Sequence, residues 1–171
     1  MKTASVIVLP YDPAWKTAFG QIRQELEKAL EDLILDIEHV GSTSVEGMSA
    51  KPCIDVDVII PDYSQWDAVV AKLEAIGYFH EGDLGIPERE AFCYSCKPHL
   101  MKHHLYVCPK TSRELHRHIT FRNFLRANPA ALRQYSAVKE QAARLFPNDI
   151  DGYMQYKAPC IGALYAQCGL D

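Results

Sequence analysis

Residues 53–60 have the sequence CIDVDVII, and this run indicates the centre of the fold. Its apolar side chains are mostly β-branched and it ends at Pro61, so we predict a buried β-strand. Because side chains alternate across a strand, Asp55 and Asp57 share one face. Two carboxylates on an apolar strand repel each other and lose hydration unless a cation lies between them. The run therefore predicts a site for Mg²⁺ or Mn²⁺, because Mg²⁺ prefers oxygen ligands, often one or two carboxylates.

A polar turn precedes this strand, and it consists of Gly41, Ser42, Thr43 and Ser44. Gly41 lies fourteen residues before Asp55. We predict that residues 45–50 form a short helix, whose free N–H groups and dipole attract phosphate oxygens. Gly41 allows close approach of the backbone, and the Ser42 hydroxyl adds a donor. The turn and the aspartates together predict a site for a metal-bound triphosphate.

The alternative is that Ser42 only caps a helix and that the aspartates mark a strand fraying into solvent. A P-loop is excluded because the chain has no G-x-x-x-x-G-K-[ST] motif. Lys51, which lies between the turn and the strand, is interpreted as a phosphate ligand, with an ordinary solvated lysine as the alternative.

The remaining pattern predicts an α+β fold in one domain, residues 1–171. Asp12 and Pro13 begin a helix of about twenty residues, with apolar side chains at three- and four-residue steps. Further strands are expected at 35–40, 78–81, 90–95 and 103–108. Further helices are expected at 64–76, 113–127, 129–145 and 149–167, with Pro159 kinking or splitting the last one. The result is a mixed sheet flanked by helices, followed by a helical C-terminal half.

The amino-acid composition of the chain argues against some classes of function. The net charge of −4 argues against an extended nucleic-acid surface. No apolar run reaches the roughly 18 residues of a membrane span, and the N-terminal apolar run is too short for a signal peptide. We therefore expect a cytoplasmic protein with six reduced cysteines.

The sequence resembles the GrpB family, whose members are similar to the nucleotidyltransferase superfamily of DNA polymerase beta. The resemblance rests on IEHVGSTSV at 37–45, Gly47, AKP at 50–52, Ile54 and Asp55, with further agreement at 11–15, 103–107, 121–126, Pro129, Tyr153 and Lys157. It implies a nucleotidyltransferase-like sheet with a helical tail. It also implies that Gly41 and Ser42 hold a triphosphate, and that Asp55 and Asp57 bind Mg²⁺.

The resemblance to the superfamily also implies a third carboxylate on a later strand. The matching strand, 103–108, has no Asp or Glu; His104 and Tyr106 share the relevant face. GrpB members generally have histidine in this strand, so the departure is from the superfamily. We predict that His104 acts as a general base, since its ordinary pKa lies near neutrality.

Two further cations are candidate anion ligands. Arg122 lies at the margin of the apolar side of the predicted helix 113–127, and Lys157 lies on the last helix. At 100° per residue, Arg113 and Arg117 are expected on the opposite side from Arg122 and Arg126, so that the two pairs cannot line one pocket if the helix is continuous. A surface or structural ion pair is the alternative for Arg122 and Lys157.

The chain also has a group of thiols and imidazoles that invites a zinc interpretation: Cys93, Cys96, His99, His103, His104 and Cys108. Zinc needs about four such ligands in a tetrahedron. Cys93 and Cys96, three apart on a strand, would face opposite ways, so we favour buried thiols beside a polar histidine strand.

These observations predict a Mg²⁺-dependent nucleotidyltransferase that acts on a nucleoside triphosphate and an unidentified small acceptor. The alternative is a non-catalytic protein that binds a nucleotide or phosphometabolite in a degenerate site. A hydrolase or metal-binding protein that uses the histidines is a third possibility.

Overall fold

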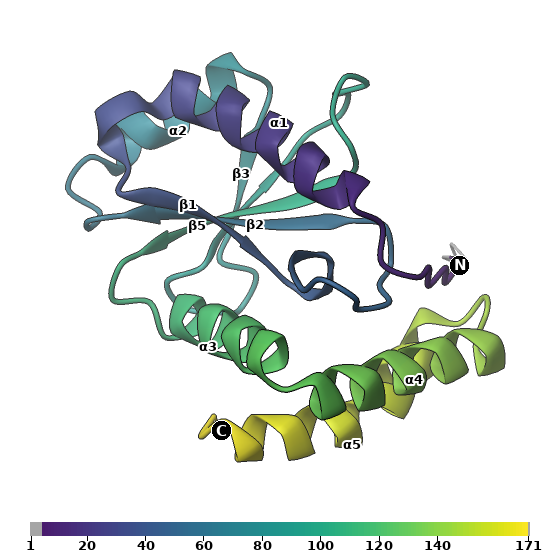
Figure 1. Cartoon of the computed structure of the whole chain (residues 1–171). Helices are drawn as coiled ribbons and strands as arrows, with labels where there is room; N and C mark the ends of the chain where they lie inside the picture. Colours follow the sequence, from purple (N-terminus) through teal and green to yellow (C-terminus); the bar gives the residue numbers. More distant parts are fainter. Residues whose placement is uncertain (1–4, 171) are drawn as a thin grey trace.

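The computed structural model describes residues 5–170. Its centre is a five-stranded sheet with the order β1-β2-β5-β4-β3 (Figure 1). β2 and β5 are parallel, and the other neighbours are antiparallel. The strands are β1 (Asp36–Val40), β2 (Ile54–Ile60), β3 (Phe79–Gly82), β4 (Glu90–Cys93) and β5 (His103–Pro109). The predicted mixed sheet and α+β class are confirmed.

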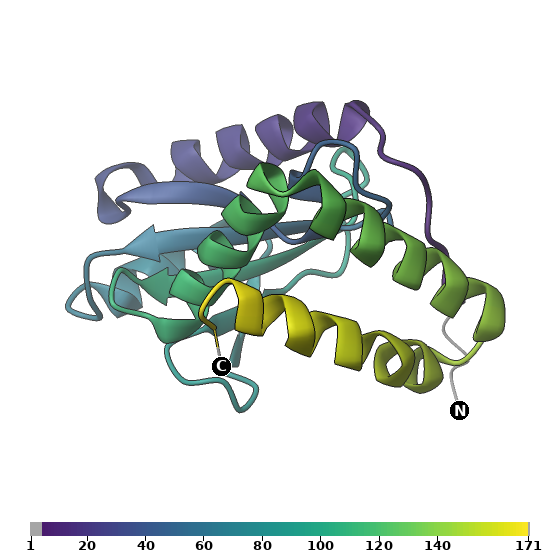
Figure 2. The same ribbon diagram turned by 60° about the horizontal axis from the view of Figure 1, so that its bottom comes forward.

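Helices lie on both sides of this sheet, as Figures 1 and 2 show. α1 (Ala14–Leu30) and α2 (Trp66–Ala75) cover one face. On the other side lie α3 (Arg113–Ala127), α4 (Pro129–Leu145) and α5 (Ile150–Gln167), which form the predicted helical C-terminal half. Across residues 5–170, the helices are too short or too polar to cross a membrane.

The side chains of β2 alternate between the apolar core on one face of the sheet and the two aspartates on the other. Ile54, Val56 and Val58 are fully buried and pack in the main apolar cluster with α1 and α2. Asp55 and Asp57 lie between them in the strand and therefore face the side of α3. Burial of aliphatic side chains at about 1.5–3 kcal/mol each anchors the strand and, with it, the position of both carboxylates.

A second apolar cluster ties the segment after β1 to the C-terminal helices. Val45 and Met48 pack with Leu125 of α3, Tyr135 of α4 and Leu164 of α5. Each of these five side chains is at most 5% exposed. The three helices thereby hold the turn at residues 41–44 against the sheet.

One predicted local feature is wrong. Residues 45–50 do not form a helix: a single 3-10 turn covers Ser42–Ser44, and the chain then runs through further turns. Gly47 has φ = 85°, in the left-handed region, and Val45 is extended, so a helix cannot continue here. Of the two effects predicted for Pro159, a split is excluded, because α5 runs as one helix from Ile150 to Gln167 with the proline inside it; a kink stays a prediction.

Candidate functional site

The two aspartates of β2 lie on the face that the sequence predicts, but in different environments. Asp57 is completely buried, whereas the Asp55 side chain is 32% exposed. Burial raises the pKa of Asp57, although the hydrogen bond and charge of His118 oppose this. Asp57 Oδ1 is buried and has no hydrogen-bond partner among residues 5–170. A buried carboxylate oxygen without a donor is costly unless a ligand approaches it.

Each aspartate is paired with a histidine. His104 of β5 is the parallel-strand neighbour of Asp55, and its Nδ1 lies 3.1 Å from Asp55 Oδ1. His118 of α3 places Nδ1 2.6 Å from Asp57 Oδ2 and Nε2 3.3 Å from Glu114 Oε1. The argument that only a cation balances the two acids is therefore wrong, because the imidazoles also do so.

These pairs change the protonation of both rings. The hydrogen bond to Asp55, with a smaller contribution from Cys53, raises the pKa of His104 to about 10. Burial lowers the pKa of His118, but the hydrogen bond and charge of Asp57 outweigh it, and the net pKa is raised. In this arrangement His104 is an imidazolium at neutral pH and has no free electron pair with which to accept a proton.

Gly41 brings the turn directly against Asp55. Its φ is 73°, and an added Cβ would lie 2.2 Å from Asp55 Oδ2. The Thr43 hydroxyl forms a hydrogen bond with His39 Nε2 of β1. The Ser44 hydroxyl donates a hydrogen bond to the Gly41 carbonyl oxygen. Ser42 is half-buried. Of the three predicted hydroxyl residues, Ser42 is the one held beside Asp55 with its side chain turned toward the helices.

A cavity of about 220 Å³ lies between the turn, β2 and the two last helices. Ser42, Asp55 and His104 line one side of it, and Lys51 and Lys157, both predicted from the sequence, line the other. Lys139 of α4 lies there too and donates a hydrogen bond from Nζ to Ser42 Oγ (2.6 Å). The structure thus joins the predicted turn, one aspartate and two predicted lysines in one place.

A second cavity, of about 230 Å³, lies on the α3 side of Ser42 and Asp55. Arg117 and Arg122 both line it, so the prediction that they cannot share a pocket is wrong. Long arginine side chains reach around a helix, and Cα directions alone do not place their charges. Arg122 Nη1 donates to Glu38 Oε2 (2.6 Å) and to the carbonyl oxygen of His39 (3.0 Å). The charge of Arg122 is therefore already paired with Glu38 within the protein.

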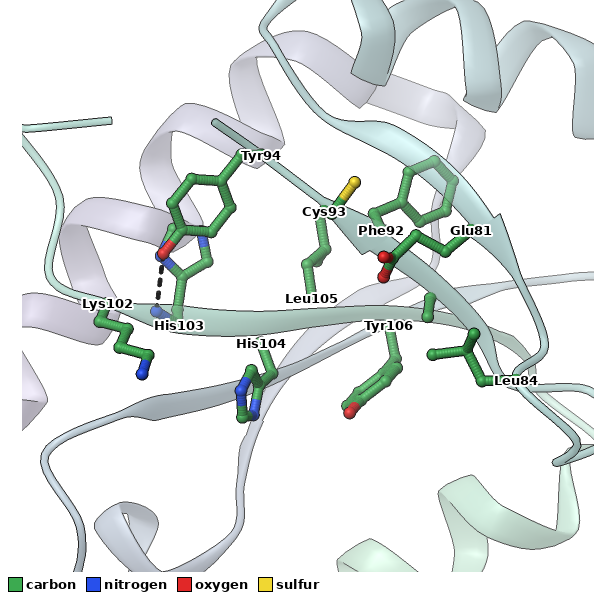
Figure 3. Close-up of a pocket in the computed structure, with 11 residues that line it drawn as sticks. Glu81, Leu84, Phe92, Cys93, Tyr94, Lys102, His103, His104, Leu105 and Tyr106 are labelled. Atoms are coloured by element: carbon green, nitrogen blue, oxygen red, sulfur yellow. Dashed lines mark hydrogen bonds between the residues drawn. The ribbon is translucent and has the colours of Figure 1, made fainter. Parts of the chain in front are cut away.

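A groove of about 500 Å³ lies beyond His104, where β4 and β5 diverge (Figure 3). His104 and Tyr106 extend to one side of β5, and His103 extends to the other, where its ring stacks on Tyr94 at 4.5 Å. The backbone N of His103 donates to the Tyr94 hydroxyl (3.1 Å). Glu81 also lines the groove. The groove and the lysine-lined cavity thus meet at His104.

Sequence reasoning missed two residues of this site. Lys139 lies on the inward side of α4, in step with the buried Tyr135 and Ala142. A lysine in an apolar stripe is the signal that would have found it. His118 has no comparable local signal, because only the packing of α3 on the sheet brings it to Asp57.

The donor set fits Mg²⁺ better than zinc. Residues 5–170 contain no group of three or more His, Cys, Asp and Glu side chains arranged to hold a metal ion. Cys93 and Cys96 are exposed free thiols, and Cys108 is a buried one. Two carboxylates with one unpartnered oxygen match the way Mg²⁺ is bound, with substrate phosphates and water completing its shell.

Comparison with known proteins identifies the family. The family model described as GrpB protein matches residues 5–167. The chain belongs to the GrpB family. A UPF0157 protein of Pseudomonas aeruginosa is 36% identical over 152 residues, which cover 88% of this chain and 62% of that protein. The chain thus spans about three fifths of the length of that GrpB relative.

Solved structures agree with the family and the fold. The crystal structure of the conserved protein GrpB from Enterococcus faecalis matches with a TM-score of 0.82 and 36% identity, covering 95% of this chain and 96% of that one. The Cid1 poly(U) polymerase with bound MgGTP matches with a TM-score of 0.53 and 12% identity, covering 79% of this chain and 44% of that one. The GrpB fold of this chain is therefore nucleotidyltransferase-like.

Proposed function

We propose that this GrpB-family protein transfers a nucleotidyl group from a nucleoside triphosphate to a small acceptor, with Mg²⁺ or Mn²⁺ as cofactor. One observation carries the proposal. Within residues 5–170, Asp57 Oδ1 is buried and has no hydrogen-bond partner, on the strand face that Asp57 shares with Asp55, which lies against the Gly41 turn. Structural similarity to a nucleotidyltransferase that binds MgGTP supports it.

Asp55 and Asp57 would hold the metal ion. Bound Mg²⁺ neutralises phosphate charge and fixes the reacting phosphate in position. Gly41 and Ser42 would contact phosphate oxygens through the backbone and the Ser42 hydroxyl, with Thr43 and Ser44 keeping the turn in shape. Lys51 and Lys157, which line the same cavity as Ser42, would bind phosphate oxygens beyond them.

The two spaces that meet at His104 suggest how the reactants are arranged. Displacement at phosphorus needs the attacking and leaving oxygens roughly in line. With pyrophosphate leaving on the lysine side, the acceptor would approach from the groove between β4 and β5. The acceptor oxygen bonds to the α-phosphorus, the bond from that phosphorus to the bridging oxygen breaks, and pyrophosphate departs with the electron pair.

His104 would take the acceptor's proton, on the nitrogen Nε2 that does not pair with Asp55. The raised pKa of His104 depends first on its hydrogen bond to the Asp55 carboxylate. When Asp55 is engaged by a cation, that stabilisation of the imidazolium weakens and the pKa of His104 falls toward neutrality. His104 thereby becomes a base only after substrate and metal have assembled.

A non-catalytic protein that binds nucleotides or phosphometabolites is the second candidate. Two observations favour it. β5 presents His104 and Tyr106, and no carboxylate, opposite the aspartates. Both aspartates already have histidine partners.

The experiment that separates these functions measures pyrophosphate release from each nucleoside triphosphate with Mg²⁺ and pools of small hydroxyl and amine acceptors. Binding is measured by calorimetry in parallel. The double variant Asp55→Asn, Asp57→Asn should lose Mg²⁺-dependent nucleotide binding, whereas Asp32→Asn, at an exposed carboxylate after α1, should keep it. Unchanged affinity in the double variant contradicts the site. Mg²⁺-dependent binding without pyrophosphate release from any acceptor pool favours the second candidate.

A further inference from the structure

Three lysines of different elements converge on the cavity beside Ser42. Lys51 precedes β2, Lys139 is on α4 and Lys157 is on α5, and all three line this cavity of about 220 Å³. Their ammonium groups lie over aromatic rings. Lys51 and Lys157 are 5.4 and 4.6 Å from the centroid of Tyr153, and Lys139 is 4.4 Å from that of Tyr135. Three cationic side chains thus share one small space.

Carboxylates do not balance these lysines. Lys139 is 2% exposed and Lys157 is 9% exposed, yet none of the three forms an ion pair within residues 5–170. The nearest acids are used elsewhere. Asp55 pairs with His104, and Glu140 accepts a hydrogen bond from the Ser49 hydroxyl (2.6 Å).

A buried amine without a counter-ion costs the folded protein free energy. Such an arrangement in a cavity beside Ser42 favours the binding of an anion, which stabilises the ammonium forms. The required charge is larger than one, since three amines surround the space. A compact polyanion with several acceptor oxygens satisfies this need, because charge-assisted hydrogen bonds from lysine to phosphate are among the strongest available.

We propose that the three-lysine cavity is a pyrophosphate subsite that Lys139 anchors. This inference rests on the proposed function in one respect: it assigns the cavity to the two terminal phosphates of the triphosphate. It also identifies the substrate class, because a nucleoside monophosphate would leave the subsite empty. Lys139 both contacts the polyanion and holds Ser42 Oγ toward it through the 2.6 Å hydrogen bond.

The subsite takes up protons when it is filled. Burial and the neighbouring lysines lower the pKa of Lys139 well below its ordinary value, and burial, followed by Lys51, lowers that of Lys157 to about 8. Asp55 opposes the shift at both, and Glu140 opposes it at Lys139. A bound polyanion favours the ammonium forms and raises both pKa values. Pyrophosphate binding near pH 8 is therefore coupled to proton uptake.

The test titrates the whole protein with inorganic pyrophosphate in the presence of a chelator, so that no metal and no transfer chemistry are involved. Calorimetry at pH 8 in two buffers of different ionisation enthalpy gives the protons taken up. We expect net uptake, and we expect inorganic phosphate to bind at least about tenfold more weakly than pyrophosphate. Equal observed enthalpies in the two buffers, which would mean no proton uptake, or no pyrophosphate binding, overturn the inference.

Variants assign the effect to Lys139. Lys139→Met, which removes the amine and keeps an unbranched side chain one atom shorter, should weaken pyrophosphate binding at least about tenfold and reduce proton uptake. The control Lys28→Met, at an exposed lysine on α1, should change neither. If Lys139→Met does not fold, Ser42→Ala and Lys157→Met test the same cavity from its other walls. Undiminished affinity in the variants that fold overturns the inference.

The pyrophosphate subsite can be confirmed or rejected independently of the proposed nucleotidyl transfer. Asp55→Asn with Asp57→Asn should keep or strengthen metal-free pyrophosphate binding, because the negative charge of Asp55 in the cavity wall is removed. Binding in that variant supports the subsite even if no nucleotidyl transfer is ever detected. Conversely, transfer activity together with pyrophosphate affinity that is insensitive to Lys139 retains the transferase and overturns the subsite.

Discussion

His118 Nδ1 of α3 lies 2.6 Å from Oδ2 of Asp57, a carboxylate that no solvent reaches. The two residues are 61 positions apart in the chain. This contact fixes one oxygen of Asp57, whereas Oδ1 has no hydrogen-bond partner in the part of the chain that the structure describes. The contact therefore stabilises the Asp57 charge on β2 through one oxygen and leaves the other available to the proposed metal ion.

Removing this imidazole should destabilise the fold. His118→Leu leaves a buried carboxylate unpaired, and we expect a loss of about 3–5 kcal/mol in the free energy of unfolding. Asp57→Asn in the same chain should restore part of that loss, because the uncompensated charge is gone. Urea denaturation of the two single variants and the double variant measures the coupling. Strictly additive losses would show that the contact contributes nothing.

Gly41 and Gly47 form a matched pair for testing the turn. Both have φ in the left-handed region, 73° and 85°, but an added Cβ clashes with Asp55 only at Gly41. Gly47→Ala should carry a backbone cost of about 1–2 kcal/mol, and Gly41→Ala a cost of about 1–3 kcal/mol, because φ = 73° with ψ = −176° is a combination that glycine adopts far more readily than other residues. Gly41→Ala should in addition displace the Asp55 carboxylate and abolish Mg²⁺-dependent nucleotide binding, as measured by calorimetry. Equal nucleotide affinities in the two variants argue against a site at Asp55.

Lys157 should make stability depend on pH in a defined window. Burial lowers its pKa from 10.5 to about 8 in the folded protein, so the unfolded chain binds more protons between these values. The resulting penalty, roughly 3 kcal/mol, is fully present below pH 8 and vanishes as the pH rises to 10.5. Lys157→Met should therefore stabilise the protein at pH 7 and lose this advantage by pH 10.5. Thermal unfolding across that range, with Lys28→Met as control, measures it.

A variant of Arg122 tests whether this cation stabilises the fold or binds phosphate. Its side chain is 10% exposed and its guanidinium joins α3 to Glu38 and His39 of β1. Arg122→Met should lower the free energy of unfolding by about 2–3 kcal/mol, since charged hydrogen bonds are lost. It should change nucleotide affinity less than Lys157→Met does, when both are measured by calorimetry below the unfolding temperature. The reverse order would make Arg122 the phosphate ligand that its sequence position first indicated.

Elements set by local pattern were predicted closely. The bounds of α3 (Arg113–Ala127) and α4 (Pro129–Leu145) match the expected helices, with Pro129 starting the second of them. β2 starts one residue after its expected first residue. The turn after Gly41 was predicted less well, because its conformation depends on Val45 and Met48 packing on helices that begin only at Arg113.

The sequence by itself determined that Asp55 and Asp57 share a face, because side-chain alternation along a strand follows from backbone geometry alone. It also determined the glycine turn before them and the helical character of the C-terminal half. Tertiary structure alone decided the partners: His118 on Asp57, and Lys139 on Ser42 across 97 positions. The physical reason is that such pairs form only when the C-terminal helices pack on the sheet, and that packing depends on the summed burial of distant apolar side chains.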